Sequence, residues 1–128
     1  MGKRIVAMGD GLWDLFPDGP RFGGATANYA CHTSILGAEV FMVSGVGEDD
    51  RGEGLLQVYR KHGVCTDHVQ VLQDYPTGVV HVELTENGLP TFTIGENARK
   101  LISRIRGVFC FWAIARALRI PARAESPR

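Results

Sequence analysis

The chain has 128 residues, of which 45% are hydrophobic, and equal numbers of acidic and basic residues leave it without net charge. That is enough for one globular domain with a buried core. The longest apolar run, residues 108–115, excludes a membrane span, which needs about 20 residues. The odd number of cysteines, without zinc-like spacing, argues against a disulfide framework. The first residues reach Gly9 too soon for a secretory signal, so we expect a cytoplasmic protein.

The N-terminal residues predict two short strands. Residues 5–8 are a brief apolar run that ends at Gly9, which is typical of a strand buried on both faces. Residues 10–17 then read as a turn followed by a second extended piece, and residues 18–20, Asp-Gly-Pro, have the composition of a surface turn.

A pair of glycines, Gly23 and Gly24, comes next and opens a predicted helix that ends at Gly37. Paired glycines let a ligand approach the main chain closely, and a helix start offers free N–H groups. Asn28, one turn in, can both donate and accept hydrogen bonds. This combination suits a small polyhydroxylated ligand, although a tight turn before a packed helix explains it equally well. The strand expected at residues 40–43 gives a strand–helix–strand order, typical of a parallel α/β sheet.

A second helix is predicted after the acidic turn at residues 45–52. Its apolar stripe contains Leu55, Leu56 and Tyr59, and Gly63 ends it. The acids at residues 48–50 complement a helix dipole; a metal cluster is the less common alternative.

Beyond residue 69 the hydrophobic period changes to two. Residues 80–85 alternate apolar and polar side chains, Asn87-Gly88 favours a two-residue hairpin turn, and residues 91–94 alternate back. With residues 69–72 this predicts a small antiparallel sheet attached to the α/β part, either a lid or a dimerisation surface.

Several catalytic patterns are absent from the sequence. It has no P-loop, no serine nucleophile elbow and no histidine pair with metal-ligand spacing. Gly9 and Gly11 are the start of a dinucleotide fingerprint that lacks its third glycine. The residues themselves therefore indicate a ligand-binding α/β unit with a sheet flap, and they identify neither a catalytic residue nor a metal ligand.

The order of the motifs resembles the PfkB, or ribokinase-like, family of carbohydrate kinases, and its fructokinase branch most closely. Each motif alone is weak, but the set in one order is specific, and it covers roughly residues 3–98. The matching stretches are residues 9–17, 23–30, 44–52, 62–64, 76–78 and 96–98.

The resemblance implies the N-terminal part of a three-layer α/β/α fold, with a small antiparallel β-sheet lid at about residues 69–94 and the sugar between lid and body. It also implies that Asp14 binds sugar hydroxyls, with Gly23, Gly24 and Asn28 lining the same pocket. A carboxylate accepts two hydroxyl hydrogen bonds, and charge-assisted bonds are the stronger kind. Fructose or a related hexose is the implied substrate, and the lid is a possible homodimer contact.

The family's catalytic aspartate, and most of its site for ATP and Mg, lie far toward the C-terminus of chains about twice this length or more. We therefore expect an ATP-dependent sugar kinase of which only the sugar-binding half is present, inactive alone; the alternative is a non-catalytic carbohydrate-binding or interaction fragment. The helices would then be left with part of their apolar faces uncovered, and Leu55, Leu56 and Phe111-Trp112 would be partly exposed. Residues 108–111 are a possible further strand of the parallel sheet.

Residues 99–128 depart from the family and form a basic tail. They contain eight basic residues against one acid, whereas residues 1–98 contain six basic residues against thirteen acids. A tail rich in Arg, Ala and Pro is what GC-rich coding DNA gives in the wrong frame, so we expect a frameshifted or truncated kinase gene. A genuine amphipathic tail for a membrane or nucleic acid is the alternative, and we expect neither partner.

Overall fold

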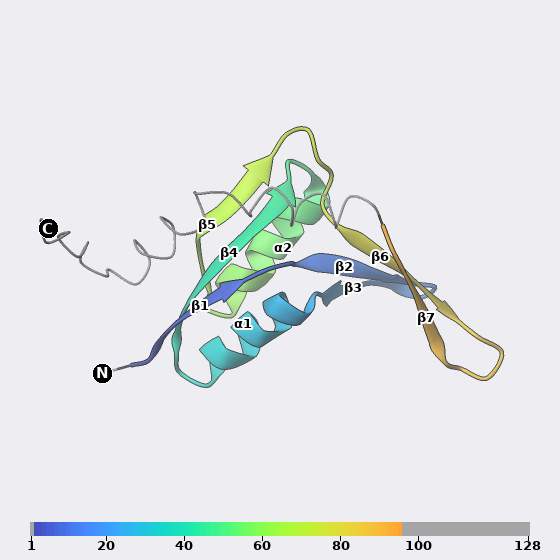
Figure 1. The fold of residues 1–128 in the computed structure, drawn as a ribbon, viewed down its shortest axis with the longest axis horizontal. Helices are drawn as coiled ribbons and strands as arrows, with labels where there is room; N and C mark the ends of the chain where they lie inside the picture. Colours follow the sequence, from blue (N-terminus) through green and yellow to red (C-terminus); the bar gives the residue numbers. More distant parts are fainter. Residues whose placement is uncertain (1, 96–128) are drawn as a thin grey trace, which may run out of the picture.

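A computed structural model describes residues 2–95 of the chain (Figure 1). The motif at residues 96–98, the basic tail and the possible strand at residues 108–111 lie outside the described residues. In chain order the described elements are β1 (Arg4–Met8), β2 (Leu12–Phe16), β3 (Gly19–Gly23), α1 (Ala25–Ile35), β4 (Glu39–Gly47), α2 (Asp50–Lys61), β5 (Cys65–Leu72), β6 (Val79–Leu84) and β7 (Pro90–Ile94).

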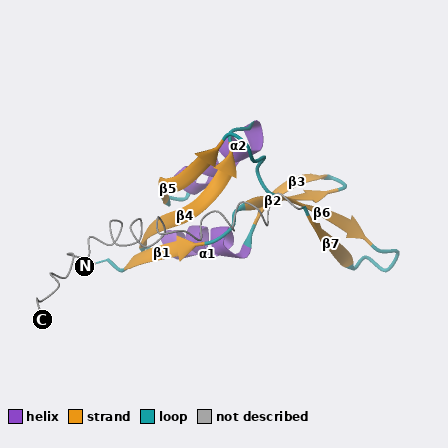
Figure 2. Cartoon of the chain, turned by 45° about the horizontal axis from the view of Figure 1, so that its top comes forward, coloured by secondary structure: helices purple, strands orange, loops and turns teal. Residues whose placement is uncertain are grey.

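The described elements form two sheets that lie at opposite ends of the molecule (Figure 2). One sheet has the order β1-β4-β5 and is parallel throughout; we call it, with its two helices, the body. The other has the order β3-β2-β6-β7; we call it the lid. The predicted α/β class is therefore confirmed.

Both helices of the body pack on the same face of its sheet. One hydrophobic cluster joins Ala30 of α1 and Leu55 of α2 to Val40 and Met42 of β4. Small residues of α1 allow this helix to lie close to the strands, because Ala27 and Ala30 are fully buried. The predicted helix end is also confirmed, since Gly37 has a left-handed φ of 96°.

Two predictions about burial are wrong. Strand β1 is not buried on both faces: Ala7 is buried under the helices, whereas Met8 on the opposite face is 52% exposed. Leu55 and Leu56, expected to be partly uncovered, are 0% and 7% exposed. The reason is that both helices pack on one face of the sheet, which buries Leu55 and Leu56 of α2 and leaves Met8 on the other face.

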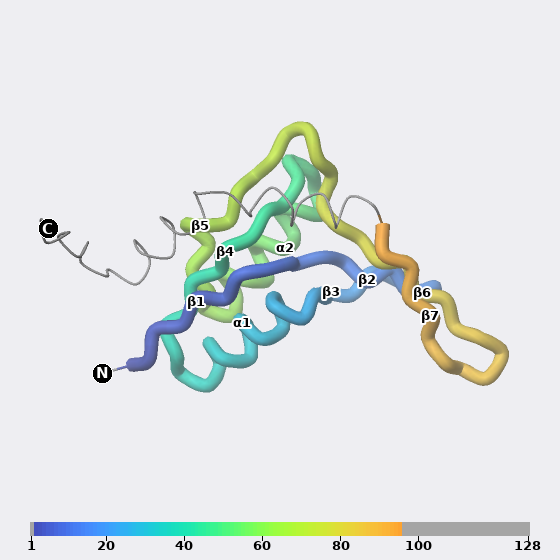
Figure 3. Tube along the Cα trace, in the orientation of Figure 1, coloured from blue at the N-terminus to red at the C-terminus, as the bar shows by residue number. Residues whose placement is uncertain are grey.

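The lid differs from the predicted antiparallel sheet in its strands and in its pairing. Residues 69–72 belong to β5 and pair in parallel with β4 of the body. Their place in the lid is taken by the hairpin β2–β3, which joins the hairpin β6–β7 through a parallel pairing of β2 with β6. The trace in Figure 3 shows the chain leaving β5 and crossing to the lid before β6. The lid is thus a mixed sheet of two antiparallel hairpins.

The turn between β6 and β7 is longer than predicted. Leu84 pairs with Pro90, the N–H of Thr85 donates to the carbonyl of Leu89 at 2.9 Å, and the N–H of Gly88 donates to the carbonyl of Thr85 at 2.8 Å. Gly88 therefore closes a three-residue loop and is not one of two central turn residues. Its φ of 75° is the left-handed conformation that such a loop requires of its last residue.

No helix in the described part of the chain is long and apolar enough to cross a membrane.

Candidate functional site

Asp14 lies in the middle of β2, on the apolar face of the lid. Strand alternation puts its side chain on the same face as Leu12 and Phe16, and the pairing of β2 with β6 adds Val80 to that face. Leu12 and Val80 are both only 6% exposed. Desolvation by these surroundings raises the pKa of the Asp14 carboxyl.

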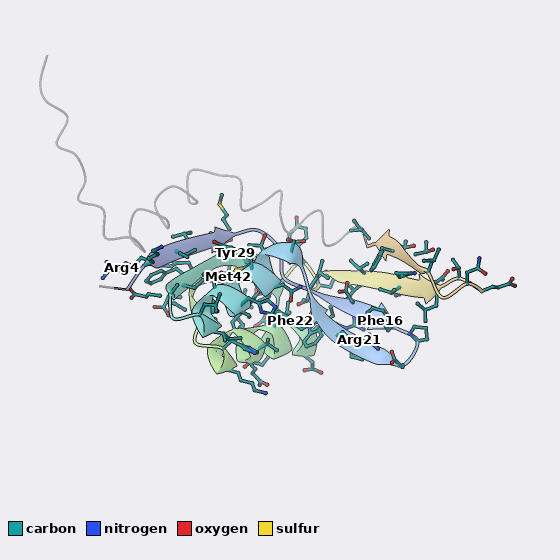
Figure 4. The ribbon with its side chains drawn as sticks, turned by 90° about the horizontal axis from the view of Figure 1, so that it is seen from below. Arg4, Phe16, Arg21, Phe22, Tyr29 and Met42 are labelled. Carbon is teal, nitrogen blue, oxygen red and sulfur yellow. The ribbon has the colours of Figure 1, made fainter. Side chains whose placement is uncertain are left out.

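Arg21 is the cross-strand partner of Asp14, yet it does not neutralise the carboxylate. Its guanidinium donates to Asp18 at 2.8 Å and lies 4.1 Å from the ring centroid of Phe16, which Figure 4 labels beside it. No ion pair or hydrogen bond engages the Asp14 side chain within residues 2–95. The carboxylate is therefore free to accept hydrogen bonds from a ligand.

Gly23, at the end of β3, is buried directly beneath this carboxylate. A β-carbon at position 23 would overlap a carboxylate oxygen of Asp14 and come within 2.8 Å of its Cγ. The sequence suggested that Gly23 lets a ligand approach the main chain. In the structure the space above Gly23 is filled by the side chain of Asp14, so any larger residue would displace that carboxylate.

Gly24 is the N-cap of α1 and has a φ of 100°. A β-carbon here would lie 2.8 Å from the carbonyl oxygen of Asp10, and the same carbonyl accepts a hydrogen bond from the N–H of Ala27 at 3.2 Å. The turn after β1 and the start of α1 are thus packed into one unit. No side chain caps this helix start.

Asn28 is brought less close to the others. Its backbone N–H donates to the carbonyl of Gly24 at 2.9 Å, which places it one turn into α1, where its side chain is exposed. It makes no side-chain hydrogen bond to Asp14 in the part of the chain that the structure describes. The structure therefore assembles Asp14, Gly23 and Gly24, with Asn28 beside them on the helix.

The Gly9 to Gly11 turn does not form an open phosphate cradle. A β-carbon on Gly9 would overlap the hydroxyl of Thr26, and one on Gly11 would overlap the hydroxyl of Tyr59. These glycines permit close packing of α1 and α2 against the turn, which explains the incomplete dinucleotide fingerprint.

Trp13 supports Asp14 from the opposite face of β2 and was not singled out in the sequence. Its indole N–H donates to the carbonyl of Arg51 in α2 at 2.9 Å. Its ring contacts Phe22 edge-on at 6.3 Å between centroids, and Phe22 contacts Tyr59 in the same way at 5.8 Å. The sequence signal that could have identified Trp13 is strand alternation, because the neighbour of Asp14 in a strand points to the opposite face of the sheet.

Asp49 makes a second link between α2 and the lid. As the N-cap of α2 its carboxylate accepts from the N–H of Gly52 at 2.7 Å, which fits the predicted helix start. It also accepts from Thr77, at 2.6 Å from the hydroxyl and 2.8 Å from the N–H. Desolvation acts to raise the pKa of Asp49, but the hydrogen bonds from Thr77 and Gly52 and the nearby Arg51 outweigh it and hold the pKa below its ordinary value.

Thr77 is only 3% exposed, and its hydroxyl accepts a hydrogen bond from the N–H of Gly47 at 2.9 Å. The acids at the start of α2 thus serve the helix and this connection, and no group of three or more His, Cys, Asp or Glu among residues 2–95 could hold a metal ion.

Comparison with known proteins matches residues 19–106 to the family described as pfkB family carbohydrate kinase. The aminoimidazole riboside kinase of Salmonella typhimurium is 32% identical over 96 residues, which are 71% of this chain and 30% of that protein.

Solved structures of sugar kinases resemble the described fold. The fructokinase of Vibrio cholerae O395 aligns with a TM-score of 0.69 and 30% identity, over 75% of this chain and 35% of that one. A sugar kinase of Pyrococcus horikoshii in complex with ATP aligns with a TM-score of 0.65 and 30% identity, over 73% and 34%. The chain thus spans about a third of the length of each of these proteins.

Proposed function

This chain belongs to the pfkB family of carbohydrate kinases and has the N-terminal part of the ribokinase-like fold, and from that premise we propose that it binds the sugar of an ATP-dependent sugar kinase. Asp14 is the residue that accepts hydrogen bonds from sugar hydroxyls, and Gly23, Gly24 and Asn28 line the same pocket. The observation that carries this proposal is the Asp14 carboxylate, which lies on an apolar sheet face above Gly23 and has no side-chain partner within residues 2–95.

The chemistry of such a carboxylate suits a sugar. Hydroxyls on adjacent carbons can each donate to one carboxylate oxygen, and apolar neighbours such as Leu12 and Val80 favour contact with the ring carbons. Because Arg21 is held by Asp18 and Phe16, Asp14 does not have to exchange an ion pair for the ligand. A site of this kind rejects analogues without the hydroxyl, since the carboxylate would be left buried and unpaired.

Fructose or a related hexose is the proposed substrate. Its support is the fructokinase of Vibrio cholerae O395 among the similar structures. The aminoimidazole riboside kinase among the relatives makes a pentose-based ligand the comparison to test. We also propose that the protein forms a homodimer through the lid and that it is located in the cytoplasm.

ATP with Mg is the proposed phosphoryl donor by family membership, and the described residues do not supply its site. The glycine turn after β1 is filled by the hydroxyls of Thr26 and Tyr59, which leaves no room there for a phosphate. Phosphoryl transfer depends on groups positioned around the γ-phosphate. We therefore assign sugar binding to residues 1–98, no catalytic residue to this chain and no function to residues 99–128, and we expect no ATP turnover from the 128 residues alone.

Calorimetry with fructose, ribose and aminoimidazole riboside tests this proposal on the 128-residue chain. We expect one of these sugars to bind, and to raise the melting temperature by mass action. Asp14→Ala should weaken that binding by about tenfold or more, because a hydrogen bond to a charged group is worth about 1.5–3 kcal/mol. Binding unchanged in Asp14→Ala would remove Asp14 from the site, and sugar-dependent ADP release would contradict the expected lack of turnover.

A further inference from the structure

The start of α2 makes two separate contacts, one with the segment that leads into the lid hairpin β6–β7 and one with the lid hairpin β2–β3. At the first point Asp49 accepts both hydrogen bonds from Thr77, two residues before β6 begins. At the second point the indole of Trp13 in β2 donates to the carbonyl of Arg51. We call these two contacts together the α2 anchor.

The two points of the α2 anchor meet beside Asp14. The backbone N–H of Trp13 donates to the carbonyl of Gly78 at 3.1 Å, and Gly78 directly follows Thr77. Trp13 is therefore held by its ring on α2 and by its backbone on the segment that Asp49 holds. Asp14 is the next residue along β2, and the alternation of the strand turns its side chain to the opposite, apolar face.

We propose that the α2 anchor positions the lid, and with it the Asp14 carboxylate, for binding of the sugar. Asp49 and Thr77 are positioning residues that do not touch the ligand. The inference rests on the proposed sugar-binding function of Asp14.

The local geometry sets a specific demand on both residues. The Thr77 hydroxyl donates to Asp49 and accepts from the N–H of Gly47, the last residue of β4. It therefore joins the body sheet, the start of α2 and the segment before β6 at one buried side chain. A residue that served only to cap α2 would need a single acceptor for Gly52, so the remaining bonds of Asp49 serve the connection to the lid.

Three variants separate positioning from simple stability. Thr77→Val keeps the side-chain shape but removes the hydroxyl, whereas Thr77→Ser retains it. Asp49→Asn keeps an N-cap of equal quality for Gly52, but its amide N–H₂ cannot accept the second bond from Thr77. Glu53→Gln is the matched control, because Glu53 is a carboxylate in the first turn of α2 whose side chain, within residues 2–95, is paired with Arg60 and not with the lid.

The experiment measures the dissociation constant of fructose, or of whichever tested sugar binds, and amide hydrogen exchange across β6–β7 and β4. We expect Thr77→Val and Asp49→Asn to weaken sugar binding by about tenfold or more, since displacement of a binding group by about 1 Å is costly. Exchange should accelerate in residues 79–94 and not in residues 39–46; Gly47 is left out of the comparison because its N–H donates to the Thr77 hydroxyl itself. Thr77→Ser should retain both readouts of the parent chain, and Glu53→Gln should leave both unchanged.

Two outcomes would overturn the proposal. One is a lower melting temperature in Thr77→Val with unchanged sugar affinity, which would reduce the α2 anchor to a stability contact. The other is acceleration of exchange in β4 as much as in β6–β7. If the parent chain binds no sugar, the proposed function and the positioning proposal fail together. If the parent chain binds sugar, and the variants show faster lid exchange but the same sugar affinity, the positioning proposal alone fails.

Discussion

The ionised form of the Asp14 side chain is less stable in the folded, unliganded protein than in water, because the apolar lid face desolvates it. Its pKa is raised by this desolvation, so the protonated carboxyl is favoured by folding. The associated stability is fully present below the ordinary pKa of about 3.9 and is lost as the pH rises through the raised value. At pH 7 the ionised Asp14 therefore lowers the free energy of unfolding.

We expect Asp14→Asn to raise the melting temperature of the unliganded chain at pH 7, because the amide is neutral and similar in shape. The gain should shrink as the pH is lowered toward 3, where the parent carboxyl is protonated. Sugar affinity should fall by about tenfold or more, since charge-assisted hydrogen bonds are lost. A pH series of thermal melts with calorimetry measures both effects. A lower melting temperature in the variant at pH 7 would show that Asp14 has an unrecognised favourable partner.

At the scale of single residues, the sequence motifs singled out Asp14, Gly23, Gly24 and Asn28 as pocket residues. The motifs did not explain why each residue type is needed at its position. Gly23 is required by the Asp14 side chain across the hairpin, which depends on the β2–β3 register. Thr77 and Trp13 were passed over because their roles come from contacts with residues 28 and 38 positions away. Such pairs leave no local pattern in the chain.

Among the elements, those with a complete local signal were predicted well. The helices between Gly24 and Gly37 and before Gly63 are confirmed, because glycine ends and a periodic apolar stripe are local features. The strand at residues 69–72 was found but assigned to the wrong sheet. An alternating strand can pair with any neighbour, so its partner follows from the tertiary fold. The strand Gly19–Gly23 was missed, since glycine and proline obscure its β-character.

The hairpin β6–β7 provides a test at the scale of an element. Gly88 has a φ of 75°, and a β-carbon there would meet no atom within 4 Å. The cost of a side chain is therefore conformational alone, about 1–2 kcal/mol for an ordinary L-residue and more for a β-branched one. We expect Gly88→Val to accelerate hydrogen exchange across residues 79–94 while β1 and β4 remain protected.

Gly88→Asn is the matched control for this substitution, since asparagine adopts the left-handed conformation more readily than other residues with a side chain. It should exchange at nearly the parent rate. Equal acceleration in both variants would mean that the side chain itself, and not its backbone conformation, disturbs the loop. Acceleration in β1 as large as in the hairpin would mean that lid and body unfold as one unit.

For the whole molecule, the main feature is that helices pack against only one face of the body sheet. The sequence analysis predicted uncovered apolar surface, but it placed that surface on the helices and not on the sheet. Ala7, Val40 and Met42 lie on the face beneath α1 and α2. The opposite face carries Val6, Met8 and Phe41, and no helix of residues 2–95 packs against it. Periodicity identified apolar faces on the helices, but which sheet face the helices choose follows from the handedness of the strand–helix–strand connection.

The exposed part of this face at Met8 should influence the solubility of the 128-residue chain. Met8 is 52% exposed and lies on β1, an edge strand of the body sheet, and an apolar edge strand favours association between copies. We expect Met8→Lys to increase the soluble fraction and to reduce light scattering on warming. Sugar affinity should change little, because the Met8 side chain lies on the sheet face opposite to α1, the helix that carries Asn28. The control is Leu36→Lys, since Leu36 is 86% exposed at the end of α1, away from that face. If Leu36→Lys improved solubility as much as Met8→Lys, scattered apolar exposure would explain the association and the sheet face would have no special role.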